Sequence, residues 1–160
     1  MGELVFFCGK MGSGKSTMAR ELASKPDSVL ISEDAWLAKL YPDEINTFDD
    51  YLLYSARLKP LIKQLAIDLL AAGVTVILDF PGNTQQQRKW FKGIFQIADY
   101  PHRLIYLEAE DDVCLNRLAL RREEQPERAA FDNPTVFHQV TQYFKAPSED
   151  EGFQIDVIEQ

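Results

Sequence analysis

Cysteine and histidine are scarce in this 160-residue chain, which has two of each. Neither Cys8 nor Cys114 has a CxxC neighbour or a cluster of His and Cys ligands, so the sequence offers no zinc pattern and no disulfide framework. His102 and His138 have no companion nucleophile or ligand nearby, and no Ser-His-Asp arrangement is visible. We therefore expect two reduced, buried thiols, as suits a reducing compartment.

Long apolar runs and positive charge are also in short supply. The longest apolar stretch, residues 66–78, is interrupted by Asp68 and Gly73 and is too short to cross a bilayer. The first residues show no basic leader or cleavable apolar segment, so we expect a soluble, cytoplasmic protein without a membrane partner. Lys and Arg number 17 against 25 acidic residues, a net charge of −8, which counts against nucleic acid as a partner.

Strand and helix patterns alternate along the chain, whose length suits a single domain over residues 1–160. Apolar runs without a period of two predict buried strands at 3–8, 28–31, 74–78, 103–107 and 153–158. Helices are expected at 15–24, 34–40, 49–72, 84–98, 111–124 and 134–144. Strands buried on both faces indicate an α/β three-layer sandwich, with a largely parallel five-stranded sheet and helices on both faces. The sequence leaves the oligomeric state open.

A glycine-rich segment between the first strand and the first helix fits the P-loop pattern GxxxxGK[ST]. The residues expected to bind nucleotide are Gly9, Lys10, Met11, Gly12, Ser13, Gly14, Lys15, Ser16 and Thr17. In this motif the backbone N–H groups and the helix dipole face phosphate oxygens. Lys15 reaches the β- and γ-phosphates, and Ser16 offers its hydroxyl to Mg²⁺. The pattern predicts ATP and Mg²⁺ as the bound cofactors.

Asp79 follows the apolar run of the third predicted strand, where a P-loop site needs a second carboxylate. It could hold Mg²⁺ directly, through water, or through Ser16. The alternative is a carboxylate that only caps the loop at the end of the strand. Together, Ser16 and Asp79 are the predicted metal ligands.

With these motifs in place, the chain resembles the small P-loop kinases of the zeta-toxin, polynucleotide-kinase and chloramphenicol-phosphotransferase type, often described as AAA-type ATP-binding domains. The segments that carry the resemblance are 9–17, 32–34, 76–79 with Arg88, 113–118 with Arg121, and 147–153. The resemblance implies a kinase-like P-loop NTPase fold with a lid at about residues 117–133. It also implies a phosphotransferase that moves the γ-phosphate of ATP to a hydroxyl of a small molecule.

The resemblance places Asp34 beside the acceptor hydroxyl as a base, although Asp34 could equally cap the helix predicted at 34–40. Arg121, and after it Arg117, would stabilise the transferred phosphate from the lid; the alternative is a solvated helix end. Lys15 completes this catalytic set.

Two further residues are predicted on the acceptor side. Arg88 would face the acceptor or the phosphates, with a surface arginine as the alternative, and Trp36 would line the acceptor pocket unless it packs in the core. Glu33, next to Asp34, is expected at the surface.

Two other functions remain open at this point. A polynucleotide 5′-hydroxyl kinase would share every catalytic residue but needs a basic channel. An ATP-binding regulatory module without an acceptor would make Asp34 and the lid arginines dispensable. The segment 80–84, Phe-Pro-Gly-Asn-Thr, matches no particular substrate class, so the sequence does not identify the acceptor.

Overall fold

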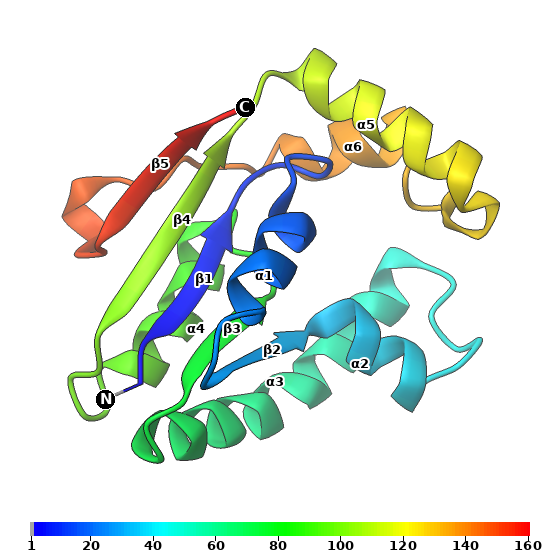
Figure 1. The fold of residues 1–160 in the computed structure, drawn as a ribbon. Helices are drawn as coiled ribbons and strands as arrows, with labels where there is room; N and C mark the ends of the chain where they lie inside the picture. The colour runs from blue at the N-terminus through cyan, green and yellow to red at the C-terminus, as the bar shows by residue number, and fades with distance from the viewer. Residues whose placement is uncertain (1) are drawn as a thin grey trace.

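A parallel sheet forms the centre of the protein in the computed structural model, which describes residues 2–160. Its strand order is β2-β3-β1-β4-β5, and each neighbouring pair is parallel (Figure 1). The strands are β1 (Leu4–Cys8), β2 (Ser28–Ser32), β3 (Thr75–Asp79), β4 (His102–Glu108) and β5 (Ile155–Glu159). The predicted five-stranded parallel sheet is confirmed, and its carboxyl-terminal edge is where ligands bind in sheets of this kind.

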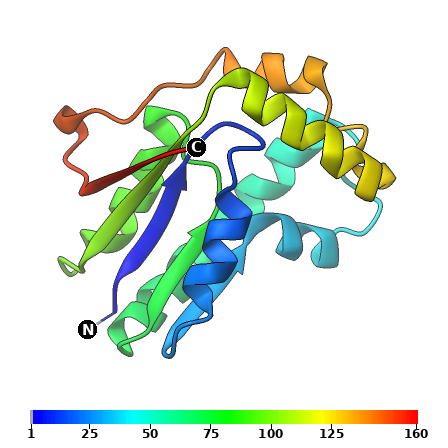
Figure 2. The ribbon, with the colours of Figure 1, turned by 45° about the horizontal axis from the view of Figure 1, so that its top comes forward.

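Helices cover both faces of this sheet. They are α1 (Lys15–Ala23), α2 (Glu33–Leu40), α3 (Phe48–Ala71), α4 (Gln85–Phe95), α5 (Asp111–Glu124) and α6 (Pro134–Thr141), with short 3₁₀ turns η1 (Pro126–Arg128) and η2 (Glu149–Glu151). The helices α5 and α6 lie beyond the carboxyl ends of the strands, above the loop between β1 and α1 (Figures 1 and 2). The fourth and sixth helices end three residues earlier than predicted.

Alternate side chains of β1 pack on opposite faces, which explains why this strand shows no period of two. Phe6 stacks on Phe91 of α4, with ring centroids 4.4 Å apart, in the cluster that α3 and α4 share. Phe7 packs on the other face in a cluster with Ala19 of α1. Because β1 is buried on both faces, its position is fixed, and this also fixes the starting point of the loop that follows it.

None of the helices within residues 2–160 is long and apolar enough to cross a membrane.

Cys8 and Cys114 are both buried free thiols, as predicted. Burial raises the pKa of Cys8 to about 11, so this thiol stays protonated at neutral pH.

Stability should fall as the pH drops below the ordinary histidine value of about 6.5, because of His102. Its ring stacks on Phe95, and its Nε2 atom accepts a hydrogen bond from the backbone N–H of Gln154 (3.0 Å). Burial, with a contribution from Lys92, lowers the pKa of His102 in the folded state. The unfolded chain therefore binds this proton first as the pH falls, which favours unfolding.

Urea unfolding between pH 5 and 8 tests this expectation, with the variant His102→Phe as the control. The variant keeps an aromatic ring but loses the titrating group, so its stability should depend less on pH than that of the wild type. Identical pH profiles for the two proteins would contradict the assignment.

Candidate active site

The loop after β1 has the backbone conformation of a phosphate-binding loop. Gly12 and Gly14 have positive φ angles of 78° and 100°, which residues with a side chain rarely adopt. A Cβ atom on Gly12 would lie 2.6 Å from the backbone oxygen of Cys114, so only glycine fits there. Gly14 is the N-cap of α1 and makes no side-chain capping bond. The first turn of α1 therefore has N–H groups available for an anion.

The segment 80–84, whose sequence matches no particular substrate class, supports this loop. The side-chain oxygen of Asn83 accepts a hydrogen bond from the backbone N–H of Gly9 (2.8 Å). Thr84 and Gln87 form a capping box at the start of α4, and Gln87 also accepts from the N–H of Asn83 (2.8 Å). Sequence reasoning missed Asn83 because its partner lies 74 residues away.

Three side chains of the P-loop are engaged by, or buried in, the protein itself. Lys10 forms an ion pair with Asp111 of α5 (2.8 Å), and Met11 packs against the apolar cluster beneath α5 and α6. Ser13 is buried, and its hydroxyl has no hydrogen-bond partner. At positions 10 and 11, the loop can therefore offer a nucleotide its backbone N–H groups but not the side chains of Lys10 and Met11.

Lys15, Ser16 and Asp79 lie together at the carboxyl ends of β1 and β3. The Ser16 hydroxyl donates a hydrogen bond to Oδ2 of Asp79 at 2.8 Å, so the structure brings the two predicted metal ligands together. Burial lowers the pKa of Lys15, and the charge of Asp79 opposes this effect. Lys15 is thus a partly desolvated cation with acidic neighbours, a state that an added phosphate would stabilise.

The donor set fits a magnesium ion bound together with nucleotide phosphates. Within residues 2–160 no group of three or more His, Cys, Asp or Glu residues could hold a metal ion alone. A P-loop magnesium ion takes most of its oxygens from phosphate and water, and needs only a hydroxyl and a carboxylate from the protein. Ser16 and Asp79 supply these two groups, and the unpartnered Ser13 hydroxyl is a further polar atom in the same loop.

Asp34 lies in a pocket of about 440 Å³ beside this pair. The pocket is lined by Ser16, Arg20, Leu30, Ser32, Asp34, Ala35, Asp79 and Arg128. Burial raises the pKa of Asp34, as does the charge of Asp79, while Arg128 lowers it. The pocket therefore combines a carboxylate with an elevated proton affinity and the hydroxyl and carboxylate expected to hold Mg²⁺.

The alternative interpretation of Asp34 as a helix cap is wrong. The N-cap of α2 is Ser32, whose hydroxyl accepts from the N–H of Ala35 (3.4 Å), and the helix begins at Glu33. The carboxylate of Asp34 is accordingly not used in capping and stands on the pocket wall.

A second pocket, of about 360 Å³, adjoins α1 and contains Arg117. It is lined by Gly14, Thr17, Met18, Glu21, Leu107, Arg117 and Gln160. The guanidinium of Arg117 donates to the backbone oxygen of Ser13 (3.0 Å) and to Oε1 of Gln160 (3.3 Å). Arg117 and Arg121, which were predicted to act together, therefore lie in different surroundings, with Arg117 against the P-loop.

Arg121 is held in the predicted lid segment, residues 117–133, by the buried side chain of Asp132. Asp132 accepts from Nε and Nη2 of Arg121 (2.6 and 2.8 Å) and from Nε of Arg128 (2.6 Å). Burial raises the pKa of Asp132, but the hydrogen bonds from Arg128 and Arg121 outweigh this, so its pKa lies below the ordinary value. Sequence reasoning missed Arg128, which reaches the pocket of Asp34 from η1.

Replacing Asp132 by Asn should loosen this segment, because two arginines would lose their shared anion. Both arginines are about one-third exposed (33% and 35%), so water screens part of the lost attraction. We expect a local loss of about 1 kcal/mol, or about fivefold faster amide exchange, across residues 121–133.

Hydrogen exchange with and without a non-hydrolysable ATP analogue measures this effect and tests the lid prediction. A closing lid should be less protected without the analogue than with it. Glu127→Gln removes an exposed charge from the same segment and is the control. Equal protection in both states would argue against a lid.

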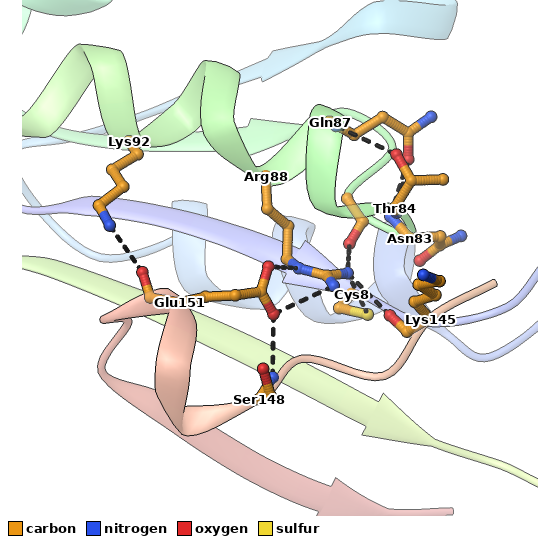
Figure 3. A network of polar contacts seen from close by, with 10 residues as sticks. Cys8, Asn83, Thr84, Gln87, Arg88, Lys92, Lys145, Ser148 and Glu151 are labelled. Atoms are coloured by element: carbon orange, nitrogen blue, oxygen red, sulfur yellow. Dashed lines mark hydrogen bonds and ion pairs between the residues drawn. The ribbon is translucent and has the colours of Figure 1, made fainter.

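Arg88 corrects the sequence prediction, because it faces neither substrate nor solvent. Its side chain is fully buried, and Nε and Nη2 donate to the two carboxylate oxygens of Glu151 (2.8 and 3.2 Å). Nη1 donates to the backbone oxygens of Gly82 (3.0 Å) and Lys145 (2.9 Å). Figure 3 shows how this network ties the start of α4 to the segment before β5. Arg88 is a structural tether.

Trp36 and Glu33 also differ from expectation. Trp36 is 36% exposed and is not among the residues that line the pocket of Asp34. Glu33, expected at the surface, is buried and accepts hydrogen bonds from the hydroxyls of Tyr51 and Ser55 on α3. Burial raises the pKa of Glu33 despite these bonds. Glu33 therefore anchors α2 on α3, next to Asp34.

The family model described as "AAA domain" matches residues 4–147 of the chain. No functionally curated protein matches it in sequence. Among solved structures, a candidate kinase from Chloroflexus aurantiacus has a TM-score of 0.75 at 19% identity, with 99% of this chain and 88% of that chain covered. A sugar kinase from Janibacter sp., in unliganded form, has a TM-score of 0.61 at 19% identity, covering 99% and 86%.

An RNA repair complex provides a third structural match. The Pnkp1/Rnl/Hen1 RNA repair complex has a TM-score of 0.64 at 19% identity, with 90% of this chain but 46% of that chain covered. At such identities the likeness is one of fold, and the predicted kinase-like P-loop fold is confirmed.

Proposed function

The chain belongs to the AAA domain family, and we propose that it is an ATP- and Mg²⁺-dependent phosphotransferase acting on a hydroxyl of a small molecule. Its fold is that of small P-loop kinases. The observation that carries the proposal is the pocket in which Asp34 shares its walls with Ser16 and Asp79. A nucleotide-binding module without an acceptor has no need for a carboxylate that lines the same pocket as its metal ligands.

In this proposal the protein's groups divide between the nucleotide and the acceptor. The P-loop amides and Lys15 bind the β- and γ-phosphates, and Arg117 lies beside the pocket suited to the rest of the nucleotide. Ser16 and Asp79 hold Mg²⁺, which neutralises phosphate charge when bound. Asp34 orients the acceptor hydroxyl and takes its proton.

The transfer then forms one bond and breaks one bond. The acceptor oxygen bonds to the γ-phosphorus, the bond from that phosphorus to the β–γ bridging oxygen breaks, and ADP leaves with the electron pair. Arg121 and Arg128, anchored through Asp132, are suited to stabilise the charge that spreads over the transferred group.

A screen of hydroxylated metabolites, antibiotics, nucleotides and a 5′-hydroxyl oligonucleotide for acceptor-dependent ADP release tests the proposal. Stimulation by a small molecule, with a phosphorylated product, is the expected result. Stimulation by the oligonucleotide alone would favour a polynucleotide kinase, which the net charge of −8 disfavours. ATP binding without stimulation by any compound would favour a regulatory module.

A further inference from the structure

Arg20 is a cation in the acceptor pocket that the proposed mechanism does not use. It lies on α1, four residues after Ser16, and four-residue spacing places both side chains on the same face of the helix. Both line the pocket that contains Asp34. Within residues 2–160 the guanidinium of Arg20 makes no ion pair and no side-chain hydrogen bond, so its donors are free for a ligand.

The other charged side chains that line this pocket either have a hydrogen-bond partner in the protein or have a role in the proposed mechanism. Asp79 accepts from Ser16, and Nε of Arg128 donates to Asp132. Arg128 lines the pocket and, with Arg121, lowers the pKa of Asp34, so both cations act on the carboxylate that would receive the hydroxyl. Arg20 lies four residues, about 6 Å of helix rise, from Ser16. It therefore offers positive charge about one helical turn from the predicted Mg²⁺ ligand Ser16, on the wall of the same pocket.

We propose that the acceptor is a small hydroxyl compound with a phosphate or carboxylate group, and that Arg20 binds this anionic group while Asp34 receives the hydroxyl. The inference rests on the proposed phosphotransferase function. Guanidinium binds both kinds of anion through paired hydrogen bonds. The anionic group is only an anchor: the new bond forms at the hydroxyl oxygen, and the proton goes to Asp34.

Electrostatics of the whole protein support the need for such an anchor. The net charge is −8 and the pocket lining holds two arginines and two carboxylates, so an anionic acceptor needs a cation that has no protein partner, and Arg20 is such a cation. A volume of about 440 Å³ suits a molecule of the size of a sugar phosphate and is small for a folded polymer. A phosphorylated or carboxylated metabolite fits these limits better than a nucleic acid.

Arg20 also has a purely structural explanation, which makes a different prediction. It lies in the last turn of α1, where a cation interacts favourably with the helix dipole. In that case its loss would reduce stability slightly and would not change the response to any acceptor.

Matched acceptor pairs that differ in one anionic group separate these explanations. The pairs are glycerate and glycerol, ribose 5-phosphate and ribose, and adenosine 3′-monophosphate and adenosine, tested within the wider screen for ADP release. The variant Arg20→Gln is compared with Lys25→Gln, which removes an exposed charge just beyond the same helix without touching the pocket.

The expected result is that active acceptors are anionic and that their neutral partners are poor substrates. Arg20→Gln should raise the KM for the anionic acceptor about 10- to 100-fold, the usual effect of losing a charged hydrogen bond, and leave the KM for ATP unchanged. Lys25→Gln should behave as wild type. Ribose 5-phosphate, glycerate and the mononucleotide distinguish small phosphates, carboxylates and nucleotides as the source of the anion.

Four outcomes would overturn the inference, and they can be told apart. Neutral acceptors phosphorylated as well as anionic ones, or an Arg20→Gln variant with wild-type KM values, would refute the anionic anchor and leave the phosphotransferase intact. If no compound of either kind stimulates ADP release although ATP binds, the proposed function itself fails. Preference for an oligonucleotide over every small anion would refute the small-molecule class.

Discussion

Replacing Asp34 by Asn is expected to lower phosphoryl transfer about 10²- to 10⁴-fold, the usual contribution of a positioned acid–base group. The substitution keeps the size of the side chain and much of its hydrogen bonding but removes the group that takes the proton. ATP affinity should stay close to wild type, because Lys15 and the P-loop amides bind the phosphates. Transfer to the acceptor and nucleotide affinity are measured in parallel on both proteins.

The structure removes one alternative explanation for the result of this experiment. Ser32 caps α2, so the loss of a helix cap cannot explain a reduced activity of the variant. Asp49→Asn, a change at an exposed carboxylate on α3, is the matched control and should have wild-type activity. Unchanged transfer in Asp34→Asn would remove Asp34 from the mechanism and favour a regulatory module.

Replacing Lys15 by Ala should weaken ATP binding about 100-fold or more, because the β- and γ-phosphates lose a charged donor held in a fixed position. Burial already lowers the pKa of Lys15, so its charge costs free energy in the unliganded protein. The variant should therefore be no less stable to heat than the wild type.

Isothermal titration with a non-hydrolysable ATP analogue and Mg²⁺ measures the affinity of this variant. Lys25→Ala removes an exposed lysine just beyond the other end of α1 and is expected to bind normally. An affinity of Lys15→Ala within a few-fold of wild type would contradict the assignment of the nucleotide site.

Local patterns in the sequence were enough to predict the fold. Strands buried on both faces indicated a parallel sheet, and the residues between β1 and α1 fit a complete P-loop. Each of these signals lies within about ten consecutive residues, because strand burial, helix periodicity and turn chemistry are local properties. The pairing of Ser16 with Asp79 followed from the strand ends, which meet at one edge of a parallel sheet.

Roles that depend on distant partners could not be predicted from the sequence. Arg88 looked like an acceptor ligand, but its partners Glu151 and Lys145 come from a segment about 60 residues away. The prediction of Glu33 at the surface is wrong because nothing in the sequence shows that Tyr51 and Ser55 face it. In each case tertiary packing decides whether a charged side chain binds protein or ligand.

The central claim is that the pocket of Asp34 receives a hydroxyl compound to which the γ-phosphate of ATP is transferred. ATP labelled with ³²P at the γ-position, incubated with the protein, Mg²⁺ and the acceptor found in the screen, tests this claim most directly. We predict that the label appears in the phosphorylated acceptor with wild-type protein and is nearly absent from it with Asp34→Asn. Label released only as inorganic phosphate, or equal transfer by both proteins, would contradict the claim.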